Sequence, residues 1–178
     1  LLRAVDILKN PYGLDFSYRK ITVSSVGLLD GLKTLDPKTA YIAISLNAAD
    51  DATRDRLMPI NRIYPIGKII NYAKSFKGDR RTRITFEYIL IKDVNDSLED
   101  AKRLSQILAG IRCKINLIPY NESPYIKFKT PDAKTVEQFH VHLLKKHFTA
   151  IVRNSRGQDI LGGCGQLGMR YISTQGET

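Results

Sequence analysis

The sequence predicts an α/β protein in which parallel β-strands alternate with α-helices. The chain has 178 residues, of which 43% are hydrophobic, enough for one core of ordinary size. Short apolar or β-branched runs alternate with segments of helical periodicity four times in succession. Such alternation is typical of right-handed βαβ units around a parallel sheet. The sheet could close as a barrel or stay open as a doubly wound sheet.

The first elements follow from spacing and turn chemistry. Residues 1–9 have leucine and valine at helical spacing, and turn residues at 10–13 end that helix. The β-branched run at 20–24 predicts a strand, and four leucines predict a short helix over 27–35. Residues 40–46 are nearly continuously apolar, as expected of a strand buried on both faces.

Two helices are predicted before the next strand. Asp50 or Asp51 can cap a helix that ends near Leu57. Pro65 suits the first turn of a second helix, whose apolar residues as far as Phe76 share one face.

The rest of the chain repeats the pattern. Residues 83–91, 112–118 and 148–152 predict strands, and residues 132–147 predict a helix. Ser97 followed by an acid at 100 resembles a capping box that opens another helix. The inward face of that helix is predicted to carry Leu98, Ala101, Leu104, Ile107 and Leu108.

Charge and composition narrow the function. Lys and Arg number 28 against 18 Asp and Glu, a net charge of +10, which favours an anionic partner and most commonly nucleic acid. No apolar run approaches the ~20 residues that span a membrane, and no signal-peptide pattern opens the chain, so we expect a cytoplasmic protein without a membrane partner. The two cysteines are too few for a disulfide-rich scaffold, a four-cysteine zinc site or an iron–sulfur cluster.

Small polar residues recur where the predicted strands end, which is where parallel α/β proteins bind ligands. They are Ser24, Ser45, Asn47 and Asn121. Taken one at a time, each could simply cap a helix or hold a turn. Their recurrence on successive strand ends favours a ligand pocket.

The cysteines and histidines divide into different classes. Cys164 lies between glycines in a tail with several arginines, a setting that favours a reactive thiolate, although a free thiol on the tail is an equal alternative. Cys113 alternates within an apolar strand and is predicted to be a small buried hydrophobe. His140, His142 and His147 share one helix, where positions two apart point in different directions, so a metal site is not favoured.

Three segments are distinctive, namely Val-Asn-Asp at 94–96, Asn-Leu-Ile-Pro-Tyr-Asn at 116–121 and Cys-Gly-Gln-Leu at 164–167. Together, and within a similarity that covers nearly the whole chain, they resemble the RlmN family of radical-SAM adenine methyltransferases. The resemblance implies the C-terminal part of a partial (βα)6 radical-SAM, TIM-like barrel over residues 1–152, with the first two strands missing. It assigns residues 153–178 to a tail that carries the methyl-carrier cysteine.

The resemblance also implies cofactors and site residues. Ser24, Ser45, Leu46, Asn47 and Asn121 match family positions that contact S-adenosylmethionine. Asn47 stands where the family usually has histidine, so contact there would use the backbone or a shorter side chain. The ligands of the 4Fe–4S cluster would lie outside this chain, which we therefore expect to be an inactive fragment on its own.

The family's chemistry implies a role for Cys164. One S-adenosylmethionine methylates its sulfur, and a second gives a 5′-deoxyadenosyl radical that removes hydrogen from the S-methyl group. The resulting carbon radical adds to adenine C2, and a second cysteine resolves the adduct through a transient disulfide. Cys113 does not match that second cysteine.

The implied partners are 23S rRNA, tRNA and an external electron donor such as flavodoxin, with a monomeric full-length protein. The alternatives are Cfr-like methylation at C8, and a non-enzymatic basic RNA-binding module suggested by the charge of +10.

Overall fold

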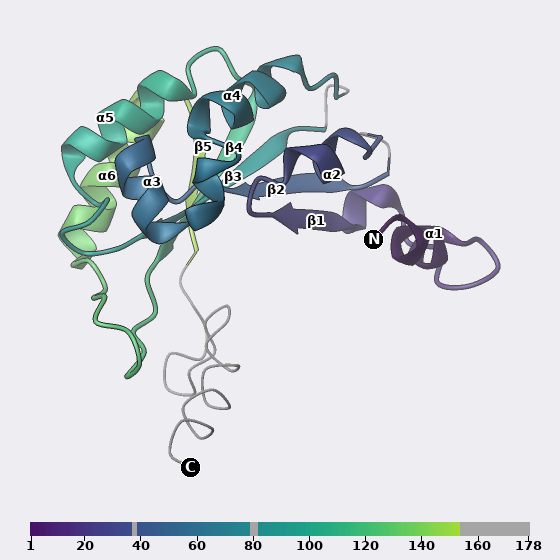
Figure 1. The fold of residues 1–178 in the computed structure, drawn as a ribbon, viewed down its shortest axis with the longest axis horizontal. Coiled ribbons are helices and arrows are strands. Elements are labelled where there is room, and N and C mark those ends of the chain that lie inside the picture. Colours follow the sequence, from purple (N-terminus) through teal and green to yellow (C-terminus); the bar gives the residue numbers. More distant parts are fainter. Residues whose placement is uncertain (37–38, 79–81, 154–178) are drawn as a thin grey trace.

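The computed structural model describes residues 1–36, 39–78 and 82–153. Its sheet contains five strands (Figure 1), namely β1 (Thr22–Ser25), β2 (Tyr41–Ser45), β3 (Ile84–Leu90), β4 (Cys113–Pro119) and β5 (Thr149–Val152). The helices are α1 (Leu2–Lys9), α2 (Leu29–Lys33), α3 (Asp51–Leu57), α4 (Ile66–Ser75), α5 (Leu98–Ile107) and α6 (Ala133–Lys145). Two 3₁₀ turns, η1 (Tyr18–Lys20) and η2 (Pro59–Arg62), complete the described elements.

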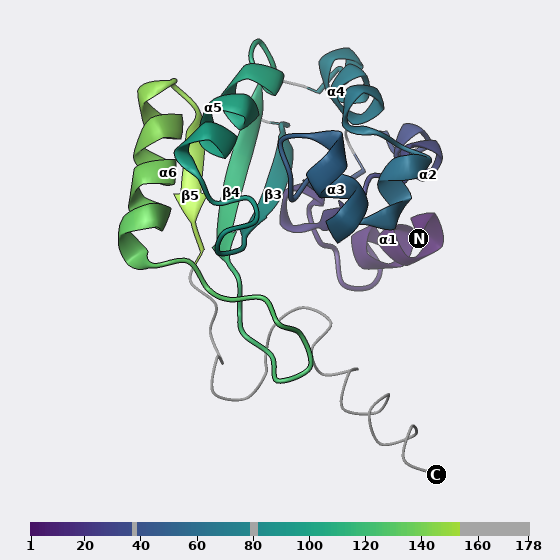
Figure 2. The same ribbon diagram turned by 60° about the vertical axis from the view of Figure 1, so that its left-hand side comes forward.

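The strand order decides between the barrel and the open doubly wound sheet, the two arrangements that the sequence allowed. The strands lie in the order β1-β2-β3-β4-β5, and every neighbouring pair is parallel. Each crossover therefore moves in the same direction, whereas a doubly wound sheet reverses direction at a switch point. Right-handed crossovers that all move one way place their helices on one side of the sheet, and Figure 2 shows α3 to α6 gathered there. The fold is thus a segment of a barrel-type α/β sheet.

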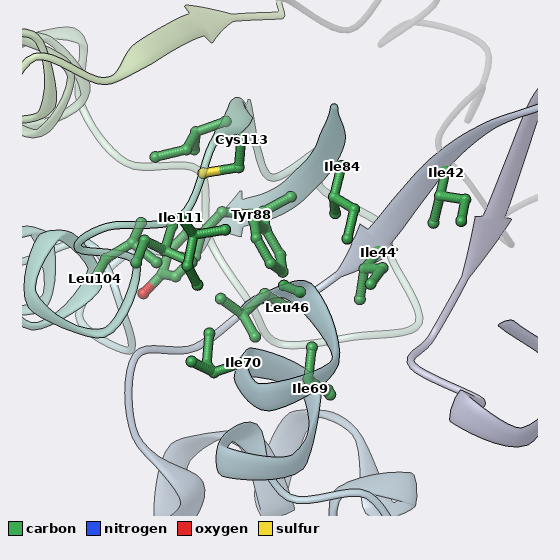
Figure 3. Packing of buried hydrophobic residues seen from close by; sticks show 14 of the residues in the cluster. Ile42, Ile44, Leu46, Ile69, Ile70, Ile84, Tyr88, Leu104, Ile111 and Cys113 are labelled. Carbon is green, nitrogen blue, oxygen red and sulfur yellow. The ribbon is translucent and has the colours of Figure 1, made fainter. Parts of the chain in front are cut away.

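The core lies between the sheet and these helices. Strand residues that point toward the helices are almost completely buried and pack on α4 and α5 (Figure 3). This set includes Ile42, Ile44, Phe86, Tyr88, Ile115 and Leu117. The ring of Tyr88 also lies 5.4 Å from that of Phe139 in α6, measured between centroids. This packing fixes the strand register on which the site depends.

The opposite side of the sheet, here called the open face, carries polar side chains. Along β3, buried residues alternate with half-buried ones, so Thr85, Glu87 and Ile89 lie on the open face. The strand register places Ser45 of β2 and Asn116 of β4 beside Glu87. In a closed barrel this face would be the interior.

The predicted elements are all present, with corrections at their edges. Asp50 caps α3, and Ser97 with Asp100 forms the capping box of α5. Pro65 is the N-cap of α4 rather than a residue of its first turn, and the predicted strand at 20–24 begins two residues later, because Lys20 belongs to η1.

One core prediction is wrong. Leu98 is 49% exposed, although Ala101 and Leu104 of the same helix, and Leu108 at its C-cap, are fully buried. Leu98 is the first residue of α5, and side chains on a helix tilt toward its N-terminus, so this one points past the end of the packed surface.

The carboxyl ends of the strands meet at one edge of the sheet. The connection between β4 and α6 extends beyond that edge (Figure 2) and includes Asn121. The predicted tail at 153–178 lies outside the described residues except for Arg153, so the domain division stays a prediction. Within the described ranges, no helix has the length and apolar character needed to cross a membrane.

Candidate functional site

The first predicted ligand contact, Ser24, lies near the end of β1 with its side chain exposed. Its neighbour Ser25 has a different task, because the Ser25 hydroxyl accepts hydrogen bonds from the backbone N–H of Gly27 and of Leu28, both at 3.1 Å. Ser25 therefore holds the turn into α2, and Ser24 is left available on the open face. The turn needs Gly27, whose φ of +98° is unfavourable for residues with a side chain.

A buried arginine holds the ends of β1 and β2 together. Arg54 in α3 has no exposed surface. Its Nε donates to the carbonyl of Leu46 at 2.9 Å, and its Nη2 donates to the carbonyls of Val26 at 2.9 Å and Ser45 at 3.2 Å. Two of these carbonyls belong to predicted S-adenosylmethionine contacts, so Arg54 fixes their backbone. The side chain of Leu46 lies in the core, which leaves only its backbone to reach a ligand.

The other side of the same guanidinium is tied to acidic residues through an amide. Its Nη1 donates to Asn61 Oδ1 at 2.8 Å, and Asn61 Nδ2 donates to carboxylate oxygens of Asp51 at 3.0 Å and Asp55 at 2.8 Å. Burial lowers the pKa of Arg54, while the charges of Asp51 and Asp55 act in the opposite direction. An arginine stays protonated even so, which means that a full positive charge lies under the strand ends.

Asn47 is built into the backbone network between β2 and β3. Its Oδ1 accepts from the N–H of Ile89 at 3.0 Å, and its carbonyl accepts from Asn95 Nδ2 at 2.8 Å. Its φ of 57° lies in the left-handed region, which asparagine tolerates better than most residues. Its side-chain oxygen is therefore already engaged, and its Nδ2 donates to Met58 Sδ at 3.3 Å, so Asn47 is held firmly at the end of β2.

Asn95 explains the Val-Asn-Asp segment structurally. Besides holding Asn47, the buried Asn95 side chain donates to the carbonyl of Ile89 at 2.7 Å and accepts from the N–H of Ile91 at 2.7 Å. Its own carbonyl accepts from the Tyr88 hydroxyl at 3.0 Å. One amide thus closes the ends of two strands.

Asn121 follows β4 at the same edge of the sheet and is buried. Beside it, the Tyr120 hydroxyl is buried and has no hydrogen-bond partner among the described residues. The Tyr120 ring packs edge-on against Phe128 at 5.9 Å between centroids, which fixes this part of the β4–α6 connection. A buried hydroxyl without a partner in the described part of the chain is uncommon.

Of the two cysteines, only Cys113 lies among the described residues. Cys113 is a buried core residue, as predicted, and burial raises the pKa of its thiol to about 12. Cys164 lies outside the described residues, and its role stays a prediction.

We expect Cys113 to resist alkylation in the native protein. With a pKa of about 12, only about one thiol in ten thousand is ionised at pH 8. Peptide mass spectrometry after iodoacetamide treatment should find the Cys113 peptide unmodified in buffer and modified in denaturant. Rapid labelling of Cys113 in buffer would contradict its burial.

His140 and His142 of α6 contact different neighbours, as their spacing predicted, whereas His147 lies beyond the end of the helix at Lys145 rather than on it. His140 Nε2 lies 3.0 Å from the carbonyl of Ala150 in β5, while His142 Nε2 lies 3.4 Å from the Ser105 hydroxyl in α5. Burial and nearby lysines lower the pKa of His142. Over the described ranges no three His, Cys, Asp or Glu side chains gather as a metal site would require.

Two structural residues of the site escaped the sequence reasoning. From the sequence, Arg54 would be expected to be exposed on a charged helix, and Asn95 to be a turn residue. The burial of both depends on acceptors and donors that only the fold brings together.

Comparisons with known proteins agree with this architecture. No protein-family model matches the chain. The dual-specificity RNA methyltransferase RlmN of Geobacter sulfurreducens is 47% identical over 168 residues, which are 94% of this chain and 47% of that protein. The RlmN of Syntrophus aciditrophicus is 47% identical over 93% of this chain and 48% of its own length.

Solved structures place the fold. A radical SAM methyltransferase from Sphaerobacter thermophilus superposes with a TM-score of 0.88 and 41% identity, over 93% of this chain and 49% of that one. A domain of pyruvate-formate lyase-activating enzyme from Bacteroides vulgatus has a TM-score of 0.64 at 21% identity and shows the fold alone. The chain spans about half the length of the curated relatives it matches. Over that half, the chain is similar to RlmN proteins in sequence and to a radical SAM methyltransferase in fold.

Proposed function

We propose that the protein is a radical-SAM RNA methyltransferase that places a methyl group on C2 of adenosine in 23S rRNA and tRNA. The observation that carries the proposal is the 47% identity to an RlmN protein over 94% of the chain. The net charge of +10 suits an RNA substrate. A cytoplasmic location and a monomeric full-length protein complete the proposal.

The polar strand ends fit S-adenosylmethionine. Ser24 is exposed and Ser45 is half-buried, so both hydroxyls are available on the open face. The Tyr120 hydroxyl next to Asn121, which has no hydrogen-bond partner among the described residues, also suits a polar ligand at this edge. We propose that these residues, with the backbone of Leu46 and Asn47, bind and orient S-adenosylmethionine. When bound, it would supply the methyl group and, with a reduced 4Fe–4S cluster, the radical chemistry.

The described residues do not fit the cluster itself. Cys113 is the one cysteine among them, and it is buried in the core between the sheet and the helices. The whole 178-residue chain contains two cysteines, too few for the three ligands that the family uses. We therefore propose that the cluster ligands come from another segment of the complete protein, and that an electron donor such as flavodoxin reduces the cluster. We also propose that these 178 residues alone are inactive.

Cys164 is proposed as the methyl carrier. Its thiolate would attack the methyl carbon of S-adenosylmethionine, so that a carbon–sulfur bond would form on Cys164 as the bond from that carbon to the sulfonium broke. S-adenosylhomocysteine would leave, and the thiol proton would pass to solvent. The carrier is needed because adenine C2 is not nucleophilic enough to attack a sulfonium directly. A second cysteine of the complete protein would later release the product by forming a disulfide with Cys164.

Product analysis tests the proposal. The complete protein, with its cluster reconstituted and a reductant present, should convert adenosine in 23S rRNA and tRNA into 2-methyladenosine, identified by mass spectrometry against both isomers. Formation of 8-methyladenosine would instead establish Cfr-like chemistry. Salt-dependent RNA binding without any methylated product would favour the non-enzymatic RNA-binding module.

A further inference from the structure

Glu87 occupies the centre of the open face. It is the middle residue of β3, and β3 is the central strand of the sheet. The residues on either side of it, Phe86 and Tyr88, are completely buried against the helices. Because side chains alternate across a strand, the Glu87 carboxylate lies on the opposite side.

A carboxylate is unusual in such an apolar strand. Glu87 is the one acidic residue in the five described strands. Its backbone carbonyl accepts from the N–H of Leu46 at 2.9 Å, so the backbone is fully part of the sheet. The side chain is half-buried, yet within the described part of the chain its carboxylate has neither a hydrogen-bond donor nor a cation within 4.0 Å. A half-buried carboxylate normally has a donor or a cation as partner.

The strand register gives this carboxylate a functional setting. Ser45 of β2 lies directly beside Glu87, and Asn116 of β4 lies directly beside it on the other side. Neighbouring strands are about 4.8 Å apart, so the three side chains form a polar row about 10 Å long. A ligand that bonds to the Ser45 hydroxyl lies within about one strand spacing of Glu87.

We propose that Glu87 is a further S-adenosylmethionine-binding residue whose carboxylate accepts hydrogen bonds from the donor groups of that ligand, with Ser45 and Asn116 on either side. A carboxylate is an acceptor only, and S-adenosylmethionine offers hydroxyl, amino and ammonium donors. The ligand also carries a sulfonium, so its net positive charge is complementary to Glu87 in a chain whose own net charge is +10. This inference rests on the proposed function, since it deepens the assignment of the same site.

The test compares ligand affinities in the complete protein. Glu87→Gln keeps the size of the side chain and removes its charge, and we expect it to weaken S-adenosylmethionine binding by about tenfold or more in isothermal titration calorimetry. Glu87→Asp keeps the charge but withdraws it by one methylene, so its affinity should lie between those of the wild type and Glu87→Gln. Glu137→Gln, an exposed acid on α6, is the matched control and should bind as the wild type does.

The possible results distinguish failure of the role of Glu87 from failure of the proposed function. Equal affinities of the wild type and Glu87→Gln would overturn the role of Glu87 and leave the proposed function standing. A wild type that does not bind S-adenosylmethionine would overturn the proposed function itself. Thermal unfolding of each variant is measured alongside, and weaker binding by a Glu87→Gln protein that unfolds at the wild-type temperature supports a direct contact.

Discussion

Replacing Arg54 by methionine should lower the free energy of unfolding by about 3–5 kcal/mol. The Arg54 side chain has no exposed surface and donates to the carbonyls of Val26, Ser45 and Leu46. Methionine fills the space but donates nothing, so these carbonyls lose a partner that water cannot easily replace. Each buried polar group left unpaired costs about 1–3 kcal/mol.

The matched control is in the same helix. Arg56 is exposed, and Arg56→Met should change the free energy of unfolding by no more than about 0.5 kcal/mol. Urea unfolding of the complete protein, followed by circular dichroism, measures both variants. Equal shifts of the urea midpoint would show that the buried network of Arg54 contributes nothing special.

Arg54→Lys adds a second test of the geometry. A lysine keeps the charge but cannot present the rigid fork that reaches three carbonyls and Asn61 together. We expect a smaller loss of stability than in Arg54→Met. Because the carbonyls of Ser45 and Leu46 belong to the proposed ligand site, S-adenosylmethionine affinity should fall in the same order.

Local chemistry made the elements of the fold predictable. The Ser97 capping box and the Asp50 cap have clear sequence signatures, and the apolar run at 40–46 marks a buried strand. Periodicity does not state which strands are neighbours, however, so the barrel-type order emerged only from the parallel pairing of β1 to β5. Leu98 was misassigned because its place in the helical period is apolar while its place at the helix end is exposed.

The candidate site was predictable only in part, for a physical reason. Polar residues after apolar strands located Ser24, Ser45, Asn47 and Asn121 at one edge of the sheet. A hydrophobicity pattern assigns arginine to the surface, so it missed Arg54, whose burial depends on acceptors just after β1 and β2 and in η2. Such acceptors are brought together only by the tertiary fold.

Replacing Cys164 by alanine should abolish methylation by the complete protein. Alanine has no sulfur to accept the methyl group, and adenine C2 is too weak a nucleophile to take it directly from S-adenosylmethionine. The expected product is therefore below detection by mass spectrometry, while S-adenosylmethionine binding persists, because the strand-end residues and Glu87 are unchanged. Loss of binding together with activity would instead mean that Cys164 acts through the binding site.

Cys113→Ala is the control, because it removes the other cysteine from a place with no proposed chemistry. Cys113 is buried in the core, so alanine should cost about 1 kcal/mol of stability and leave the product unchanged. Methylation that survives in Cys164→Ala would rule out Cys164 as the carrier. We expect no such role for Cys113, since its high pKa leaves almost no thiolate to attack a sulfonium. Methylation lost in a Cys113→Ala protein that still folds would contradict this expectation.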